Sequence, residues 1–415
     1  MITKSSSKDI GRVVLAFSGG LDTSVAVVWL REKYGVDVIT VTVDVGQNED
    51  FKEVEAKAEK LGAIKHYTLD CKREFIDEYV FKSVKANGLY QGEYPLSSAL
   101  SRPLIASKCV DIALREGADA IAHGCTGKGN DQLRFEITIK SLAPDLKVLA
   151  PVREWGFNRD WEVEYALKHG IPIKPKRERY SIDVNLWGRS IECGPLEDIS
   201  SDPPEDVFEW TNPPWKAPDK PEEVSIKFED GIPKAINGEE MDGVKLVSFL
   251  NNLAGLHGIG RIDHVEDRTT GIKTREVYEA PAATCILKAH KDLEKLVLTG
   301  RELRFKEQVD VEWCSLVYTG LWMDPLREAL DAFIDTIEKR VCGEITLRMY
   351  KGSVTIVSRK SEYSLYDVDL ASYSSSSLFD QRWAEGFITL WGLPTILANR
   401  VSRKKLSIRY AYGGE

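Results

Sequence analysis

A run of side chains suited to binding phosphate, Ser-Gly-Gly-Leu-Asp-Thr-Ser, occupies residues 18–24, between an expected apolar strand (12–17) and an expected helix (23–34). Adjacent glycines let the backbone approach a ligand closely. The N-terminus of the following helix offers unpaired N–H groups and the positive end of the helix dipole, which together bind anions. The run therefore predicts a phosphate-binding loop. The alternative is a plain strand–helix turn with Asp22 or Thr23 as N-cap, and Asp22 is suited either to Mg²⁺ or to capping.

A second glycine-rich run, Gly-Cys-Thr-Gly-Lys-Gly-Asn at residues 124–130, follows another short apolar segment. On its own it is typical of a surface turn. Neither the mononucleotide pattern G-x-x-x-x-G-K-[ST] nor the dinucleotide pattern G-x-G-x-x-G is present, and Gly258-Ile-Gly260 is only a partial match that follows helix-like sequence. The loops therefore argue against a Walker-type ATPase and a Rossmann dehydrogenase.

The amino-acid composition argues against several other classes of protein. The 415 residues carry a net charge of −9, which argues against non-specific binding of duplex nucleic acid. The seven cysteines are scattered without a C-x-x-C pair, which favours a reduced, cytoplasmic protein over a disulfide or zinc scaffold. The first twelve residues lack the apolar core of a signal peptide, and no apolar run approaches the ~20 residues that span a bilayer.

Expected strands and helices alternate from residue 12 to residue 169. Apolar strands at 12–17, 36–43, 66–69, 118–122 and 147–150 are separated by helical patterns, with helices at 23–34, 50–61, 96–115, 131–140 and 159–169. This order predicts an α/β fold with an open parallel sheet covered by helices on both faces. Both glycine-rich runs then lie at the carboxyl ends of strands, where such sheets bind ligands.

The pattern changes after residue 170. A proline-spaced linker at 171–175 precedes period-two runs at 223–228 and 352–358 and helices at 245–256, 290–298 and 325–339, which predict an α+β domain. The basic and apolar tail at 401–412 fits either a docked terminal strand or a contact between subunits. The expected division is a nucleotide-binding domain (1–170), a substrate domain (171–375) and a C-terminal segment (376–415).

Three motifs carry a resemblance to a known family. Residues 16–24 resemble the pyrophosphatase loop of the ATP-pyrophosphatase superfamily, and more narrowly that of argininosuccinate synthase. Residues 122–136 resemble the next signature of that family, and residues 258–268 with 271–281 resemble a third. The similarity extends from about residue 12 to about residue 395. It implies an adenine-nucleotide α-hydrolase-like domain, a synthetase domain and a C-terminal segment that crosses between the subunits of a homotetramer.

The resemblance also implies an activity. It is that of a ligase in arginine biosynthesis or the urea cycle that joins L-citrulline and L-aspartate into argininosuccinate. ATP is cleaved to AMP and pyrophosphate through a citrullyl-AMP intermediate. The implied cofactor is Mg²⁺ and the location is the cytoplasm, with no nucleic-acid or membrane partner. No nucleophilic triad is required.

The resemblance assigns site residues position by position. The expected ATP-binding residues are Ala16, Phe17, Ser18, Gly19, Gly20, Leu21, Asp22, Thr23, Ser24, Val43 and Gly124. The expected aspartate-binding residues are Thr126, Asn130 and Asp131. The expected citrulline-binding residues are Tyr94, Ala99, Asn130, Arg134, Ser181, Ser190, Glu266 and Tyr278. No protein ligand to a metal is assigned. Because Glu266 and Tyr278 belong to the second domain, the expected site lies in an interdomain cleft.

One segment departs from the family pattern. The family usually has Thr-Ser-Leu-Ala-Arg-Pro where residues 98–103 read Ser-Ala-Leu-Ser-Arg-Pro, so Ala99 has no hydroxyl and Ser98 or Ser101 must compensate if one is needed. This departure is the feature that favours a nucleotide-responsive binding protein without turnover. The alternative within the superfamily is a tRNA thiolase or an amide-forming synthetase, and a thiolase would need a cysteine pair, for which Cys125 and Cys193 are the candidates.

Overall fold

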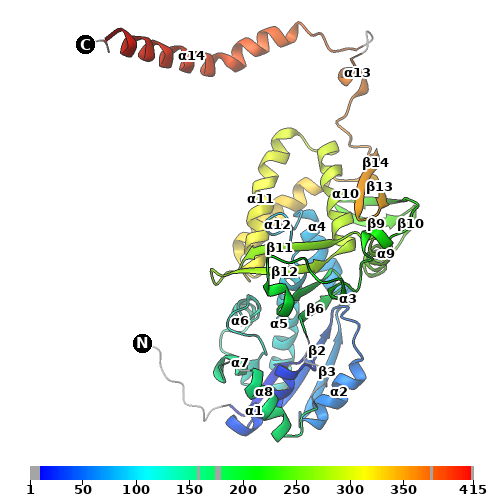
Figure 1. Ribbon diagram of the computed structural model, residues 1–415, viewed down its shortest axis with the longest axis vertical. Coiled ribbons are helices and arrows are strands. Elements are labelled where there is room, and N and C mark those ends of the chain that lie inside the picture. Colours follow the sequence, from blue (N-terminus) through cyan, green and yellow to red (C-terminus); the bar gives the residue numbers. More distant parts are fainter. Residues whose placement is uncertain (1–9, 157–158, 173–178, 374–376, 413–415) are drawn as a thin grey trace. The chain divides into compact units, whose positions relative to one another are not determined.

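A computed structural model describes residues 10–156, 159–172, 179–373 and 377–412 (Figure 1). Part of the expected linker at 171–175 lies outside the described residues. The chain forms two compact units, one up to residue 363 and one from residue 364 onward, and each is described by itself. No helix among the described residues is long and apolar enough to cross a membrane.

The first part of the chain forms a parallel five-stranded sheet of order β3-β2-β1-β4-β5. The strands are β1 (Arg12–Ala16), β2 (Asp37–Asp44), β3 (Lys65–Asp70), β4 (Ala120–Ala122) and β5 (Lys147–Leu149). The main helices are α1 (Leu21–Tyr34), α2 (Phe51–Lys60), α5 (Ser97–Glu116), α6 (Asp131–Leu142), α7 (Pro151–Glu154) and α8 (Arg159–Lys168). The predicted fold class is confirmed.

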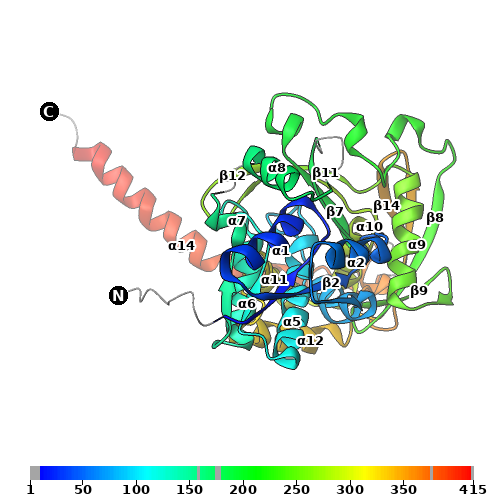
Figure 2. The same cartoon turned by 90° about the horizontal axis from the view of Figure 1, so that it is seen from below.

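Alternate residues of β1 explain why helices cover both faces of this sheet. Val13 and Leu15 belong to a core that includes residues of α1 and α8, whereas Val14 belongs to a core that includes residues of α5 and α6 (Figure 2). Successive side chains of a strand point to opposite faces, so an uninterrupted apolar strand requires an apolar partner on each side. The sheet edge at the ends of β1 and β4 stays open to solvent at Ser18 and Gly20.

Two antiparallel sheets follow in the same compact unit. One has the order β11-β12-β7-β6, formed by β6 (Ser181–Asn185), β7 (Gly188–Glu192), β11 (Arg261–Asp267) and β12 (Lys273–Glu279). The other has the order β10-β9-β8-β13-β14, formed by β8 (Glu222–Glu229), β9 (Ile232–Ile236), β10 (Glu239–Glu240), β13 (Gly343–Tyr350) and β14 (Ser353–Lys360). The predicted strands at 223–228 and 352–358 are present as β8 and β14, whereas the four-stranded sheet was not predicted.

Helices α9 (Gly243–Leu256), α10 (Pro281–Val297), α11 (Gly300–Tyr318) and α12 (Pro325–Glu338) belong to this part of the unit. The helix α11 was not predicted. It begins with a capping box, in which Thr299 and Glu302 satisfy each other's backbone N–H groups, and its buried stripe includes Trp313 and Val317. The remaining helical segments are α3 (Lys72–Glu74), a π-helix (Phe75–Val80), α4 (Phe81–Lys85) and 3₁₀ turns at Gly194–Glu197, Glu205–Val207 and Pro214–Lys216.

The second compact unit contains α13 (Val368–Ala371) and α14 (Trp383–Tyr412). Residues 401–412 are therefore helical, and the expectation of a docked terminal strand is wrong. A long helix that has already begun adds residues with little further cost, and Lys, Arg and Leu are good helix formers. Apolar side chains of α14 are widely exposed, among them Phe387 (61%), Ile388 (65%) and Trp391 (76%).

Candidate active site

The loop between β1 and α1 has the form of an anion-binding turn. Gly19 takes a φ of +73°, and Gly20 is the N-cap of α1 with no side chain capping the first turn. Helix α1 thus begins before Asp22 and Thr23, so the alternative that either residue is the N-cap is wrong. Uncapped N–H groups at a helix N-terminus, together with the dipole, favour a phosphate.

The carbonyl groups of this loop are held by the protein itself. The Thr42 hydroxyl donates to the Phe17 carbonyl at 2.6 Å, and the Ser24 hydroxyl donates to the Gly20 carbonyl at 2.6 Å. The Lys57 ammonium donates to the Gly19 carbonyl at 2.5 Å. With its acceptors satisfied, the loop presents donors and the positive charge of Lys57.

The second glycine-rich loop lies against the first. A Cβ atom built on Gly124 would lie 3.0 Å from Cγ2 of Thr23, so the two loops touch where the resemblance expects a shared nucleotide pocket. Val43 is buried near the end of β2, two residues beyond the Val41 carbonyl that accepts from the Phe17 N–H at 2.9 Å. Lys128 is exposed at the tip of the second loop.

His123, which opens the second loop, is bonded within the protein. Its Nδ1 accepts from the Cys125 N–H at 3.2 Å, so Nε2 carries the proton and lies 3.2 Å from Glu136. The side chain is fully buried. His123 is therefore a packed histidine that is bonded to the backbone of its own loop.

A line of alternating charges begins at α6. The carboxylate of Asp131 accepts from Arg134 Nη1 at 2.9 Å and from Arg102 Nε at 2.8 Å. Arg102 also forms an ion pair with Asp183 on β6, in which Nη2 lies 2.8 Å from Oδ1. Burial favours the neutral acid, but Arg102 and Arg134 outweigh it and hold the pKa of Asp131 below its ordinary value. Asp131 and Arg134 thus form an ion pair one turn apart on α6, in which the Arg134 side chain is buried and that of Asp131 is partly exposed.

Polar residues gather on one face of the sheet β11-β12-β7-β6. Ser190 pairs with Tyr278 on β12 and with Asp183 on β6, and Glu266 pairs with Thr274 on β12. Residues directly opposite in an antiparallel pair share a face, as do residues two apart along a strand. Four expected citrulline residues, from four different strands, therefore share this face: Ser181, Ser190, Glu266 and Tyr278.

Helix α5 presents Ser98 to this face. The Ser98 hydroxyl donates to Asp183 Oδ2 at 2.5 Å and lies 3.3 Å from the Ser190 hydroxyl. The hydroxyl of Tyr94 accepts from the Ser98 N–H at 2.9 Å and from the Ala99 N–H at 3.4 Å. The methyl group of Ala99 is fully buried in the core. In this structure Ser98, and not position 99, supplies a hydroxyl to the polar face.

Glu266 lies among tyrosines. Its Oε2 accepts from the Tyr278 hydroxyl and its Oε1 from the Tyr318 hydroxyl, each at 2.6 Å. The Tyr94 ring stacks on Tyr278 with centroids 4.4 Å apart. Burial, and then nearby carboxylates, raises the pKa of Tyr278 and of Tyr318, so both hydroxyls remain donors. Among the described residues no Lys, Arg or His forms an ion pair with Glu266, although its side chain is only 3% exposed.

Arg134 keeps part of its guanidinium uncommitted. Its Nε and Nη2 donate to the Tyr318 carbonyl at 3.1 and 2.9 Å, and Nη1 donates to Asp131. A guanidinium has five N–H donors, so two are left for a ligand. Asn130 is buried, and its Oδ1 accepts from the Thr269 N–H at 3.0 Å.

The structure does not gather every predicted residue. Ser181 is exposed, and the hydroxyls of Ser181 and Thr126 make no hydrogen bond in the described part of the chain. Three residues in the site were not assigned from sequence: Arg102, Asp183 and Tyr318. Arg102 was visible within residues 98–103, and Asp183 follows Ser181 at strand spacing, whereas Tyr318 gave no local signal because α11 was not predicted.

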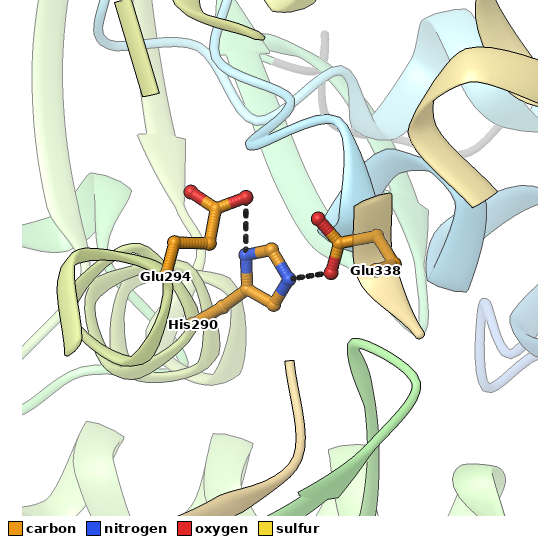
Figure 3. A group of neighbouring side chains, drawn as sticks. All are labelled: His290, Glu294 and Glu338. Atoms are coloured by element: carbon orange, nitrogen blue, oxygen red, sulfur yellow. Dashed lines mark hydrogen bonds and ion pairs between the residues drawn. The ribbon is translucent and has the colours of Figure 1, made fainter. Parts of the chain in front are cut away.

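A cluster outside this site resembles a metal centre. His290 and Glu294 on α10 and Glu338 on α12 bring potential ligand atoms within 4.8 Å of one another (Figure 3). However, the Lys306 ammonium lies 2.8 Å from Glu294, 2.9 Å from Asp310 and 3.6 Å from Glu338. Asn87 donates to Glu294 and Asp310 at 2.7 and 2.9 Å. Lys306 thus supplies the positive charge that a metal ion would provide.

A glycine-rich loop that leaves the central strand of a parallel five-stranded sheet and opens its first helix defines a nucleotide-binding α/β protein. The models of the arginosuccinate synthase N-terminal HUP domain and C-terminal domain match residues 12–172 and 180–398. The chain belongs to the argininosuccinate synthase family, which confirms the resemblance found in its motifs.

The chain is similar to relatives named argininosuccinate synthase along most of its length. It is 59% identical to that of Pyrococcus furiosus over 387 residues, covering 93% of this chain and 94% of the relative. It is 53% identical to that of Pyrobaculum aerophilum over 390 residues (94% and 98%) and 55% identical to that of Archaeoglobus fulgidus over 393 residues (94% and 99%).

The charge cluster predicts a pH-dependent stability. Burial favours neutral His290, but Glu338 and Glu294 outweigh it and raise the pKa of His290 above its ordinary 6.5. The stabilisation that protonated His290 provides is then complete below about pH 6.5, and it is lost as the pH rises through the pKa of His290 in the folded state. We expect His290→Gln to lower the melting temperature more at pH 6 than at pH 9.

His66 should show the opposite trend to His290. Burial lowers the pKa of His66, so the stabilisation that its neutral ring provides is lost as the pH falls. The decrease in melting temperature caused by His66→Gln should therefore become smaller as the pH falls. Thermal unfolding of both variants and the parent between pH 5.5 and pH 9 measures these trends. EDTA should leave the melting temperature unchanged if Lys306 is the cation of the cluster. A His290→Gln penalty that grows with pH, or a clear loss on chelation, contradicts this assignment.

Proposed function

We propose that the chain catalyses the reaction of its family in arginine biosynthesis. In this reaction the ureido oxygen of citrulline attacks the α-phosphorus of ATP and pyrophosphate leaves. The aspartate amine then attacks the adenylated carbon, which gives argininosuccinate and AMP. The observation that carries the proposal is the match of both family models, in order, from residue 12 to residue 398.

The phosphate loop is the part that binds ATP. Uncapped N–H groups of α1, the Ser18 and Thr23 hydroxyls and Lys57 face the developing negative charge of pyrophosphate. Mg²⁺ prefers oxygen ligands. The phosphates, Asp22 and the loop hydroxyls all supply oxygen atoms, so the residues present fit this ion. Mg²⁺ supplies charge neutralisation at the phosphates.

Citrulline binds on the polar sheet face. The two uncommitted donors of Arg134 suit its carboxylate, and Glu266, which lacks a cation among the described residues, suits its ammonium. Ser98 and Ser190 lie where hydroxyls can orient the ureido end, and the Ala99 backbone N–H acts by donating to the Tyr94 hydroxyl. Holding the ureido oxygen in line with the α-phosphorus can supply ~7–11 kcal/mol of the barrier reduction.

Aspartate binds at the second glycine-rich loop. Thr126 and Asn130 offer a hydroxyl and an amide to its carboxylates, and Asp131 attracts its ammonium. A carboxylate has about four lone-pair positions, of which Arg102 and Arg134 take two on Asp131. The charge line from Asp131 through Arg102 to Asp183 connects this loop with the citrulline face.

The alternatives gain no support from the structure. A tRNA thiolase would need a reactive cysteine, but burial raises the pKa of Cys125 and raises that of Cys193 to about 11, which leaves little thiolate at neutral pH. A binding protein without turnover was favoured by Ala99 alone. The Ala99 methyl group lies in the core, where it bears on neither ATP nor the sheet face.

An isotope experiment tests the reaction. Citrulline labelled with ¹⁸O in its ureido group, together with ATP, Mg²⁺ and aspartate, should give AMP that carries the label, because the ureido oxygen is the nucleophile. Mass spectrometry of AMP and an assay of pyrophosphate measure the outcome, and the reaction without citrulline is the control. Unlabelled AMP, or AMP formation that requires tRNA and a sulfur donor, contradicts the proposal.

Asp131 provides a prediction about aspartate. Asp131→Asn keeps the shape but removes the charge that attracts the ammonium, so the KM for aspartate should rise by about tenfold or more. Citrulline-dependent exchange between ATP and pyrophosphate should change far less. The matched control is Asp183→Asn, which also removes a carboxylate from Arg102. If both variants raise the KM for aspartate equally, Asp131 acts only through Arg102.

We also propose a homotetramer in which α14 contacts another copy of the chain. The exposed apolar residues Phe387, Ile388 and Trp391 support this, because a helix with a large uncovered apolar surface is typical of an interface. Sedimentation equilibrium should give four times the 46.6 kDa chain mass. Trp391→Asp with Ile388→Asp should give smaller species, and the substitution of exposed Glu385 by Gln should not. A monomeric parent contradicts the proposal.

A cytoplasmic location is supported by the cysteines, since all seven are free thiols in the structure. The division into residues 1–170, 171–375 and 376–415 remains a proposal. The gap between the two family models at residues 173–179 supports the first boundary, whereas the second compact unit begins at residue 364, twelve residues before the proposed C-terminal segment.

A further inference from the structure

A single residue, Tyr318, contacts both charged side chains that are proposed to bind citrulline, Arg134 and Glu266. Tyr318 accepts two N–H groups of Arg134 with its carbonyl oxygen, at 3.1 and 2.9 Å. Its hydroxyl donates to Glu266 Oε1 at 2.6 Å. The guanidinium carbon of Arg134 lies 5.1 Å from the centre of the Tyr318 ring. Tyr318 is fully buried, so these contacts are shielded from solvent.

The place of Tyr318 in α11 explains the contact with Arg134. Tyr318 is the last residue of this helix. The final carbonyl groups of a helix lack intrahelical partners and form the negative end of its dipole, which favours a cation. Arg134 therefore satisfies the end of α11, and α11 in turn fixes the plane of the guanidinium.

The turn after α11 holds Arg134 a second time, through its backbone. Gly320 has a φ of +84°, and a Cβ atom built on it would lie 3.0 Å from the Arg134 nitrogen and 3.1 Å from its Cα. Only a residue without a side chain lets α6 approach this turn so closely. The α11 end and the first turns of α6 are thus in direct contact.

Neighbouring aromatic rings fix the Tyr318 side chain. The Tyr90 ring stacks on Tyr318, with centroids 3.5 Å apart and planes 3° from parallel. The Tyr90 hydroxyl donates to the Asp267 carbonyl at 2.9 Å and makes no hydrogen bond to Arg134 or Glu266. With its ring held by Tyr90, Tyr318 directs its hydroxyl to Glu266.

We infer that Tyr318 is a positioning residue that sets the separation of Arg134 and Glu266 and thereby selects a ligand with an α-amino acid end. This inference rests on the proposed binding of citrulline to those two residues. Without the Tyr318 hydroxyl, Tyr278 is the one donor that Glu266 keeps among the described residues, and Glu266 is free to turn away from the ammonium. The carbonyl contact with Arg134 remains.

The test compares citrulline with 5-ureidopentanoic acid, which is citrulline without its α-amino group. We expect the parent enzyme to favour citrulline strongly in kcat/KM. Tyr318→Phe should reduce that preference about tenfold, which is the effect of one hydrogen bond to a charged group, with KM values for ATP and aspartate little changed. The control Tyr90→Phe keeps the stacking and should keep the preference.

A double-mutant cycle separates positioning from a general structural effect. Glu266→Gln removes the charge that recognises the ammonium, so adding Tyr318→Phe to it should not reduce the preference further. Gly320→Ala, which pushes α11 from α6 without removing a hydroxyl, is the second variant and should also reduce the preference.

The possible results are distinguishable. A parent enzyme that turns over no citrulline refutes the proposed function itself. Two results with an active parent enzyme would refute the role of Tyr318 while the proposed function stands. In the first, Tyr318→Phe lowers kcat/KM equally for citrulline and the analogue. In the second, Tyr318→Phe reduces the preference by the same factor with and without Glu266→Gln. An unchanged preference in both Tyr318→Phe and Gly320→Ala refutes it as well.

Discussion

The site depends on a partly buried line of alternating charges, Arg134–Asp131–Arg102–Asp183, contributed by α6, α5 and β6. An unpaired charge in such an environment is costly, whereas each charge here has a partner of opposite sign. The line therefore fixes three elements from distant parts of the sequence relative to one another. The phosphate loop is formed locally by the end of β1 and the start of α1, with support for two of its carbonyl groups from Thr42 on β2 and Lys57 on α2.

The sequence analysis succeeded where local physics decides the structure. Apolar strands bounded by helical patterns predicted the parallel sheet, and two adjacent glycines before a helix predicted the loop, in which the structure gives Gly19 a positive φ. The N-cap was misplaced because Asp22 and Thr23 are favoured capping types, whereas Gly20 leaves the amides free for a ligand. Of the two interpretations of the tail at 401–412, the docked strand is wrong, because apolar and basic residues suit a strand edge as well as a helix.

The remainder of the site could not be read from the sequence, since it depends on contacts between distant residues. Asp183, Ser190, Tyr278 and Glu266 meet only because four strands pair in one register, and a shift of one residue would turn any of these strands over. Tyr318 acts partly through its carbonyl, which no side-chain pattern reveals. Lys306 likewise reads as an ordinary surface lysine, yet it is 1% exposed.

The close approach of Gly320 to Arg134 has a consequence for hybrids assembled from two relatives. The region matched by the first family model contributes Arg134, and the region matched by the second contributes Gly320 and Tyr318. A chimaera joined between residues 172 and 180 would combine α6 from one relative with the turn after α11 from another. These two contacting surfaces would not have evolved together. The two regions also share one hydrophobic core, so such a hybrid would need matching core surfaces as well as matching surfaces on α6 and α11.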